Sequence, residues 1–359
     1  MRDLELLVTL WPSFPHFPRF IKDHRLSGIR LNSAMISNPE LEAELGLIKD
    51  LDPKLPLYFD VKGRQLRVEE VHLNPDYLDI TLNHPISVEL PALVIFKAGA
   101  DDAMLLRVEE DGKRLIFDGG PRFMVNPGES LHIKHPSLKV SGGLFSDLEL
   151  AKIERVKKEG FTRFFLSYVE SQRDVDEFLE IVGSDSEVWL KIENQKGLDY
   201  VANEFRKKPN LSLVAARGDL YIESVMPHDI LPALKLIIEK DPEACLGSRI
   251  LLSVVQPQLT EVKRALYFME ANEIDKTKVE GIIDQLTQPQ EPSCADFCEL
   301  AWLYDIGYRR MMLCDELCLK EDLLAEAINA FDAFRESYTK KPEVVEPQKR
   351  SFLRRFRKH

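Results

Sequence analysis

Two kinds of segment alternate along most of the chain. Short and mostly apolar runs are separated by longer stretches in which apolar residues recur at helical spacing. Short apolar runs are typical of strands in a parallel sheet that is covered on both faces. Eight such runs predict eight strands, at Leu6–Thr9, Gly28–Asn32, Leu57–Asp60, Arg163–Ser167, Val188–Glu193, Leu213–Asp219, Arg249–Val255 and Arg310–Cys314.

The intervening stretches predict amphipathic helices. Ser146 and Glu149 have the spacing of a capping box and predict a helix over 148–159. Further helices are predicted at 172–183, 195–208, 229–240, 259–272, 295–305 and 320–336. Eight strands alternating with helices predict an α/β fold, the (β/α)8 TIM barrel.

One segment interrupts this alternation after the third predicted strand. From Arg67 to about Pro136 the chain shows strand-like runs and turns without a helical period. We therefore predict a small all-β domain over 68–137, which would form a lid on a barrel made of residues 1–67 and 138–336. Residues 337–359 are left as a tail.

Composition narrows the class of protein. The chain has 359 residues, 44% of them hydrophobic, and a net charge of −12, which is typical of a globular protein. It has no apolar run of 18 residues, and Asp3 and Glu5 interrupt the stretch that a signal peptide would need. Five cysteines fit a reducing compartment, so we expect a cytoplasmic protein. The acidic total argues against specific nucleic-acid binding.

Positive charge is concentrated at the C-terminus. Residues 340–359 carry eight Lys or Arg and two Glu, and the segment 349–359 interleaves six of those cations with Phe352, Leu353 and Phe356. One interpretation is a disordered, solubilising tail. The other is a basic amphipathic segment that contacts an acidic partner, RNA or an anionic membrane surface.

Polar residues collect at the carboxyl ends of the predicted strands, where TIM barrels place their active sites. Glu193 and Asp219 end strands five and six, and two such carboxylates can hold one hard divalent cation. Lys191 points to the same face of its strand as Glu193, and Arg30 adds a second positive charge. A metal ion beside two cations suits an anionic substrate that gains charge during the reaction. The alternative is a set of ordinary surface ion pairs.

Two weaker signals have plainer interpretations. The cysteines include two pairs with a spacing of four, Cys294 with Cys298 and Cys314 with Cys318. Zinc binding is one interpretation, but we expect ordinary buried thiols. His132 and His135 lie in the last strand of the inserted domain, where we expect a surface strand, with a ligand contact as the alternative.

Several of these segments resemble the pyruvate kinase family. KIENQKG at 191–197 and AARGDL at 215–220 resemble the family's metal- and substrate-binding strands. GIRLN at 28–32 resembles its phosphate-binding arginine strand, and DVKGRQLR at 60–67 resembles the stretch that leads into its inserted β-domain. The resemblance covers the predicted barrel and implies the same fold.

The resemblance implies phosphoryl transfer between phosphoenolpyruvate and a nucleoside diphosphate, with Mg²⁺ or Mn²⁺ as cofactor and pyruvate as product. Lys191 would stabilise the phosphoryl group in transit, and Arg30 would bind the phosphate. Glu193 and Asp219 would hold the metal ion. The other implied roles are substrate binding by Ala216, Arg217, Gly218 and Ser167, and a monovalent-cation site at Asn32 and Asp60.

The sequence departs from the family around the nucleotide and the potassium ion. Ala34 and Met35 stand where the family has a Ser and a His, and Val61 replaces a Thr. Potassium-ligand oxygens and a nucleotide contact are therefore missing, so potassium dependence is doubtful. Gln65 replaces a Glu tied to potassium use, and Val255 falls at the place of a threonine that helps proton delivery.

Three functions stay open after these departures. Lys191 favours the first, a pyruvate kinase-like phosphoryl transfer. The second is a metal-dependent aldolase or lyase acting on 2-oxo acids, from a related superfamily of barrels with a similar Glu/Asp metal pair. The third is a non-catalytic scaffold that binds phosphoenolpyruvate or pyruvate. We expect the regulatory C-terminal domain of the family to be absent after residue 336, whereas a homo-oligomer stays open.

Overall fold

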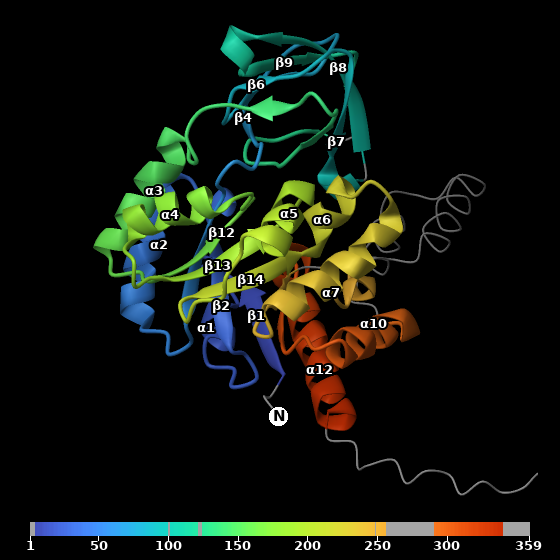
Figure 1. The fold of residues 1–359 in the computed structure, drawn as a ribbon. Helices are drawn as coiled ribbons and strands as arrows, with labels where there is room; N and C mark the ends of the chain where they lie inside the picture. The colour runs from blue at the N-terminus through green and yellow to red at the C-terminus, as the bar shows by residue number, and fades with distance from the viewer. Residues whose placement is uncertain (1–3, 100, 121–123, 248, 256–290, 340–359) are drawn as a thin grey trace, which may run out of the picture.

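A closed barrel lies below a separate antiparallel sheet in the computed structural model, which describes residues 4–99, 101–120, 124–247, 249–255 and 291–339 (Figure 1). Eight parallel strands close the barrel in the order β1-β16-β15-β14-β13-β12-β3-β2. They are β1 (Glu5–Thr9), β2 (Gly28–Asn32), β3 (Leu57–Val61), β12 (Arg163–Leu166), β13 (Glu187–Ile192), β14 (Leu211–Ala216), β15 (Cys245–Gly247) and β16 (Arg310–Met312). The predicted (β/α)8 barrel is confirmed.

The barrel strands are buried on both faces, which explains their continuous apolar runs. All six residues of β14 and all five of β2 are buried. Seven strands each contribute one side chain to a layer inside the barrel: Leu7, Tyr58, Phe165, Trp189, Val214, Cys245 and Met312. In β2 the residue beside Leu7 is Gly28, where a Cβ would lie 3.1 Å from the Tyr58 ring, so the small residue makes room for the aromatic layer.

Helices cover the outside of the barrel and confirm most of the predicted ones. They are α1 (Phe17–Phe20), α2 (Asn38–Leu51), α3 (Asp147–Lys158), α4 (Gln172–Val182), α5 (Gln195–Asn203), α6 (Arg217–Glu223), α7 (Ile230–Lys240), α10 (Cys294–Asp305), α11 (Asp315–Cys318) and α12 (Glu321–Tyr338). The helix predicted at 259–272 and the basic segment 349–359 lie outside the described residues. None of the described helices has both the length and the apolar character needed to cross a membrane.

The prediction for the seventh strand is wrong. The strand β15 is formed by Cys245–Gly247, whereas the predicted range ends in a 3₁₀ turn at Leu252–Val254. The apolar side chains of Ile250 and Val254 pack into the core without forming a strand. The hydrophobicity of this segment therefore correctly indicates burial but not strand structure. The inference that Val255 ends strand seven falls with it. Ser248, the residue after β15 in the sequence, lies outside the described residues.

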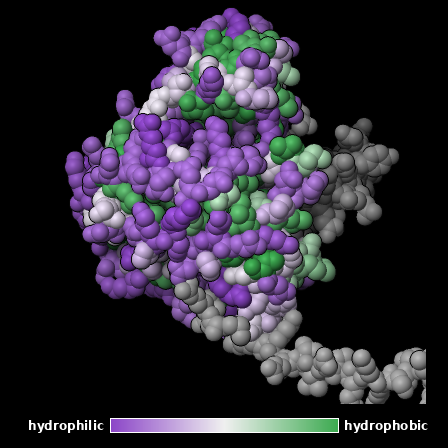
Figure 2. All heavy atoms as spheres, viewed as in Figure 1, coloured by the Kyte–Doolittle hydropathy of each residue, from purple (hydrophilic) through white to green (hydrophobic). Residues whose placement is uncertain are grey.

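The inserted domain follows β3, as predicted. Its six-stranded antiparallel sheet has the order β10-β7-β8-β9-β5-β4 and its own apolar core, which includes Phe96 and Phe117. The strands are β4 (Val68–His72), β5 (Asp79–Leu82), β7 (Ala92–Phe96), β8 (Asp101–Glu109), β9 (Arg114–Phe117) and β10 (His132–Lys134), and a small ladder pairs β6 (Ile86–Ser87) with β11 (Lys139–Val140). Figure 2 shows hydrophilic residues over much of the barrel face and apolar ones gathered on this domain.

A capping box at the start of α10 predicts a pH-dependent contribution to stability. Ser293 Oγ lies 2.7 Å from Asp296 Oδ2, and the Asp296 amide donates to Ser293 Oγ at 3.3 Å. Although burial opposes this, hydrogen bonds from Ser253 and Ser293 lower the pKa of Asp296. A lowered pKa stabilises the folded protein above the unfolded value of about 3.9, and this contribution is lost as the pH falls through the folded pKa.

We therefore expect Asp296→Asn to lower the free energy of unfolding by about 1 kcal/mol at neutral pH. The loss should be smaller at about pH 3, because this pH lies below the unfolded-state pKa of about 3.9 and part of the contribution of the ionised carboxyl is already lost there. Urea denaturation at the two pH values measures both. An equal loss at both values would contradict a role for the charge.

Candidate active site

A cavity of about 210 Å³ lies at the carboxyl ends of the barrel strands, below the base of the inserted domain. It brings together six residues that the sequence predicted for the site: Arg30, Asn32, Lys191, Ala216, Gly218 and Asp219. Arg67, Arg249 and Asp315 also line it, although the sequence assigned them no role. Residues from opposite ends of the chain therefore meet in one polar cavity.

Lys191 lies at the buried end of this cavity. Its Nζ donates to Ser167 Oγ at 2.8 Å, and it lies 2.8 Å from Glu193 Oε1 and 3.7 Å from Asp60 Oδ2. Burial alone would lower the pKa of Lys191, but Asp60 and Glu193 outweigh burial and raise it. The side chain is thus an ammonium ion held in place by three partners.

Asp60 is the anion at the centre of three cations. It is fully buried and accepts hydrogen bonds from Arg30 Nε at 2.7 Å, Lys62 Nζ at 2.9 Å and Ser167 Oγ at 3.2 Å. Burial opposes ionisation of Asp60, but Lys191, Lys62 and Arg30 hold its pKa well below the usual range. Burial also lowers the pKa of Lys62 to about 7, against the attraction of Asp60.

These contacts bear on the predicted monovalent-cation site. The side-chain cations already neutralise Asp60, and the amide of Asn32 donates to Asp315 Oδ2 at 2.7 Å. Ammonium and guanidinium groups therefore surround the oxygens that a potassium ion would need. Weak potassium dependence stays a prediction.

Glu193 and Asp219 supply oxygens that suit a divalent metal ion. Glu193 Oε2 accepts the Tyr168 N–H at 2.7 Å, and the buried Oε1 lies 2.8 Å from the Lys191 ammonium. Burial and the neighbouring Asp219, opposed by Lys191, raise the pKa of Glu193 to about 7. A buried carboxylate that lies beside a second carboxylate fits Mg²⁺ or Mn²⁺.

Two carboxylates alone cannot complete the shell of such an ion. Within the described ranges, no group of three His, Cys, Asp or Glu side chains is arranged to hold a metal. Substrate oxygens and water would therefore have to supply the remaining ligands. Divalent binding at Glu193 and Asp219 should accordingly depend on an oxygen-rich ligand.

His132 joins the inserted domain to Asp219. Its position corrects the prediction of a surface strand. It comes from β10, is only 2% exposed, and places Nε2 3.3 Å from Asp219 Oδ1 and Nδ1 2.6 Å from Glu223 Oε1. The expected surface strand is wrong at this position because α6 of the barrel covers β10. His135 differs, since it is half-buried and hydrogen-bonds Ser137 within the inserted domain.

The charges of His132, Asp219 and Glu223 stabilise one another. Although burial opposes it, Asp219 and Glu223 raise the pKa of His132 to about 9. In turn the imidazolium, against the effect of burial, lowers the pKa of Asp219 to about 2. Lys134 adds a hydrogen bond from the same strand to the carbonyl of Ile222. Positive charge on β10 therefore fastens the inserted domain to α6.

Tyr168 connects His132 to Glu193. Its hydroxyl lies 3.2 Å from His132 Nδ1, and its backbone has a φ of 54°, in the left-handed region that non-glycine residues rarely adopt. Such a conformation costs about 1–3 kcal/mol and persists where surrounding contacts hold it. Here those contacts are the Glu193 carboxylate at the backbone and His132 at the ring.

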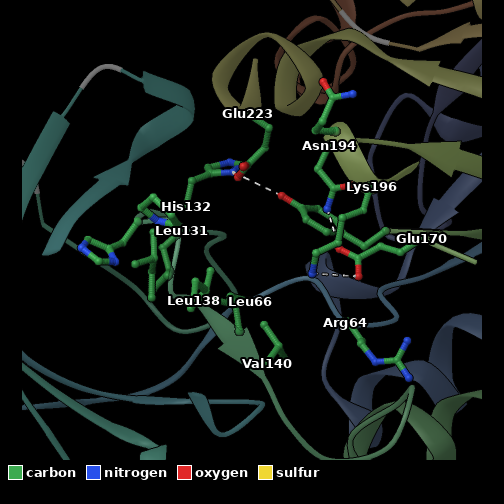
Figure 3. A pocket seen from close by; sticks show the side chains of 15 residues that line it. Arg64, Leu66, Leu131, His132, Leu138, Val140, Glu170, Asn194, Lys196 and Glu223 are labelled. Atoms are coloured by element: carbon green, nitrogen blue, oxygen red, sulfur yellow. Dashed lines mark hydrogen bonds and ion pairs between the residues drawn. The ribbon is translucent and has the colours of Figure 1, made fainter. Parts of the chain in front are cut away.

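A second cavity, of about 330 Å³, lies beside Tyr168 (Figure 3). Leu131, Leu138 and Val140 form an apolar wall, and Asn194 and Lys196 from the barrel face it. Figure 3 shows the His132 ring between the labelled Glu223 and this apolar wall. The imidazole thus lines the second cavity and also contacts Asp219.

The other predicted residues have less direct positions. Ala216 ends β14 and α6 begins at Arg217, whose guanidinium pairs with Glu299 of α10. Neither Arg217 nor Ser167 lines the 210 Å³ cavity, and the Ser167 hydroxyl bridges Lys191 and Asp60. In this structure the Arg217 side chain pairs with Glu299 and the Ser167 hydroxyl contacts Lys191 and Asp60, so both hold neighbouring side chains in place.

The cysteines divide into two environments. Cys314 and Cys318 are buried, as expected, whereas Cys294 and Cys298 are exposed on α10 with their sulfur atoms 3.9 Å apart. The prediction of buried thiols is therefore wrong for the α10 pair, because these positions face away from the core. The two pairs do not form a metal site among the described residues.

Asp315 is the acidic residue that sequence reasoning left without a role. It follows β16, and its Oδ1 lies 2.5 Å from Arg30 Nη1. Burial opposes ionisation, but Arg30 and Lys62 lower its pKa. Its position after a strand was the available signal, but sequence alone does not show which cation it meets.

Comparisons with known proteins give one consistent answer. No family model matches the chain. It is similar to the pyruvate kinases of Methanocaldococcus jannaschii (26% identity over 251 residues, 65% of this chain and 52% of that protein) and Thermoplasma acidophilum (24% over 251 residues, 65% and 45%). It is also similar to that of Borreliella burgdorferi (24% over 254 residues, 62% and 50%). The chain spans about half the length of these relatives.

A solved structure shows the same fold. The crystal structure of pyruvate kinase from Pyrobaculum aerophilum matches with a TM-score of 0.63 at 16% identity, covering 94% of this chain and 74% of that one. The match supports the arrangement of a barrel with an inserted β-domain.

The contacts of His132 predict that it holds the two domains together. His132→Gln removes the cation between Asp219 and Glu223, so amide hydrogen exchange in β10 and α6 should become at least about tenfold faster. Mass spectrometry of deuterium uptake measures this. His135→Gln is the matched control and should leave both elements unchanged. If His132→Gln also leaves exchange unchanged, the imidazolium does not hold the interface.

Proposed function

Because the chain is a divergent member of the pyruvate kinase family, we propose that it transfers a phosphoryl group between phosphoenolpyruvate and a nucleoside diphosphate and yields pyruvate. The observation that carries the proposal is the placement of Lys191 within 2.8 Å of Glu193, in the cavity that Asp219 also lines. One ammonium and two carboxylates close together can hold a metal ion and offset the negative charge of a phosphoryl group in transit.

The residues divide the work by charge. Glu193 and Asp219 would hold Mg²⁺ or Mn²⁺, which when bound supplies positive charge next to the enolate and phosphoryl oxygens. Lys191 would stabilise the transferred phosphoryl group, whose charge spreads over three oxygens. The backbone where β14 becomes α6, at Ala216–Gly218, would receive the substrate carboxylate. The Ser167 hydroxyl fixes the direction of the Lys191 ammonium.

The acceptor has a cavity beside this site. A space of about 330 Å³ is lined by Lys62, Arg67 and Lys152 together with Ala34 and Met35. Its three cations, which outnumber the carboxylates of Glu69 and Glu149 in the lining, suit a diphosphate, whereas Ala34 and Met35 give no polar side-chain contact to a base or ribose. We therefore expect weak discrimination among nucleoside diphosphates.

The same apolar pair favours a second candidate. A metal-dependent aldolase or lyase acting on 2-oxo acids would need Glu193 and Asp219 to hold the enolate but would not need a nucleotide. Ala34 and Met35 would then be neutral substitutions. A non-catalytic scaffold would use the same cavity for binding alone.

A coupled assay tests the phosphoryl transfer. With phosphoenolpyruvate, Mg²⁺ or Mn²⁺ and a nucleoside diphosphate, lactate dehydrogenase should report pyruvate formation by the wild type. We expect Lys191→Met to lower kcat at least about a hundredfold, because it removes the charge next to the phosphoryl group. Asp219→Ala should be similarly impaired through loss of metal binding. Lys240→Met, on the exposed face of α7, is the control.

The outcome separates the candidates. Pyruvate formation no faster in the wild type than in Lys191→Met would exclude the kinase. Calorimetry with oxalate, an analogue of the pyruvate enolate, would then decide between the others. Binding of oxalate that requires Mg²⁺ and is lost in Asp219→Ala keeps a lyase, whereas metal-independent binding or none favours the scaffold.

Potassium should have little effect on the reaction. Arg30, Lys62 and Lys191 already surround Asp60, and Ala34 and Val61 offer no side-chain oxygen. At constant ionic strength, replacing KCl by choline chloride should change the rate by less than about twofold. A strong and saturable stimulation by K⁺ would contradict this reading of the cation cluster.

A further inference from the structure

Arg30 has little hydrogen-bonding capacity left for a ligand. A guanidinium carries five N–H donors. In Arg30, Nε donates to Asp60 at 2.7 Å and Nη2 lies 2.5 Å from the same carboxylate. Nη1 donates to Thr9 Oγ1 at 3.0 Å and to Asp315 Oδ1 at 2.5 Å. Four of the five donors are thereby engaged within the protein, two of them on one group, Nη1.

Asp315 occupies the cavity side of Arg30. Its second oxygen accepts from Asn32 Nδ2 at 2.7 Å, so both carboxylate oxygens are held. Yet 35% of its side chain is exposed and it lines the 210 Å³ cavity, whereas Asp60 on the other side of Arg30 is fully buried. Asp315 is therefore the partner of Arg30 that a ligand can meet and displace.

Two groups of charges lie at or next to the cavity, which Arg67 and Arg249 also line. Arg30, Lys62 and Lys191 gather around Asp60, and Glu193 lies with Asp219 at the metal pair. A phosphorylated ligand would place its phosphoryl dianion among the cations and its carboxylate near the metal pair. Asp315 stands at the first position, where its carboxylate pairs with Arg30. It therefore opposes the phosphoryl group and not the carboxylate.

We infer that Asp315 is a specificity-determining residue that occupies the phosphoryl position on Arg30 and so favours ligands without a phosphoryl group. The inference rests on the proposed function, whose substrate and product differ in that group. In such a site, a phosphorylated 2-oxo acid derivative binds after Asp315 has released Arg30. An unphosphorylated dicarboxylate or 2-oxo acid binds without that step.

Calorimetry on four forms of the full chain tests this. Inorganic phosphate, phosphoenolpyruvate with Mg²⁺ and oxalate with Mg²⁺ are titrated into wild type, Asp315→Asn, Asp315→Ala and Glu316→Gln. Glu316 is the matched control, because it lines the same cavity and carries the same charge but forms no ion pair with Arg30 among the described contacts. Circular dichroism melting checks that each variant is folded.

We expect both Asp315 variants to bind phosphate and phosphoenolpyruvate at least about tenfold more tightly than wild type, since one unit charge beside a dianion is worth at least that factor. Oxalate affinity should change by less than about twofold. Glu316→Gln should match wild type for all three ligands.

Three results would overturn the inference. These are unchanged phosphate affinity in both Asp315 variants, an equal gain for oxalate, and an equal gain in Glu316→Gln, which would indicate a general charge effect. Failure of the proposed function shows separately, in the coupled assay, as pyruvate formation no faster in the wild type than in Lys191→Met. The phosphate titration needs no metal ion and still decides the role of Asp315 in that case.

Discussion

The candidate site depends on one buried charge cluster, Asp60 with Arg30, Lys62 and Lys191. Charges removed from water cost several kcal/mol each unless partners compensate them, and losing one partner leaves the others uncompensated. The cluster therefore requires β2, β3 and β13 to end at matching heights in the barrel. The neighbouring strands provide this: Asn32 pairs with Asp60 in register, and β12 connects β3 to β13.

The cluster also explains how cation binding and phosphoryl chemistry can diverge in one fold. Asp60 is saturated by side chains of the chain itself, so it no longer depends on an external cation. Glu193 pairs with one side-chain cation, Lys191, and lies beside a second carboxylate, Asp219, so these two carboxylates have capacity for an external cation. Asp60 and the pair of Glu193 and Asp219 differ in their capacity to bind an external cation because they have different numbers of cationic neighbours. Asp219 is further tied to the inserted domain through His132, which gives that domain a direct electrostatic connection to the candidate site.

Much of the fold followed from hydrophobic pattern, and the exceptions share a cause. Seven strands and most helices lay at or near the predicted places because doubly buried strands and amphipathic helices leave periodic signals. The three-residue β15 was too short to do so, and the apolar run after it packs in a 3₁₀ turn. The exposure of His132 was predicted wrongly because the exposure of a strand depends on what covers it. Here α6 of the barrel covers the strand.

The sequence by itself determined the barrel, the inserted domain and the set of charged residues at the strand ends. Strand periodicity and the position of a residue after a strand are local properties, so they can be read without coordinates. Only the tertiary structure decided which charges neutralise one another. Arg30 meets Asp315 across 285 positions of sequence, and Tyr168 adopts a left-handed backbone to reach both Glu193 and His132. Ion pairing depends on distances of a few ångströms between remote segments, which hydrophobic pattern does not encode.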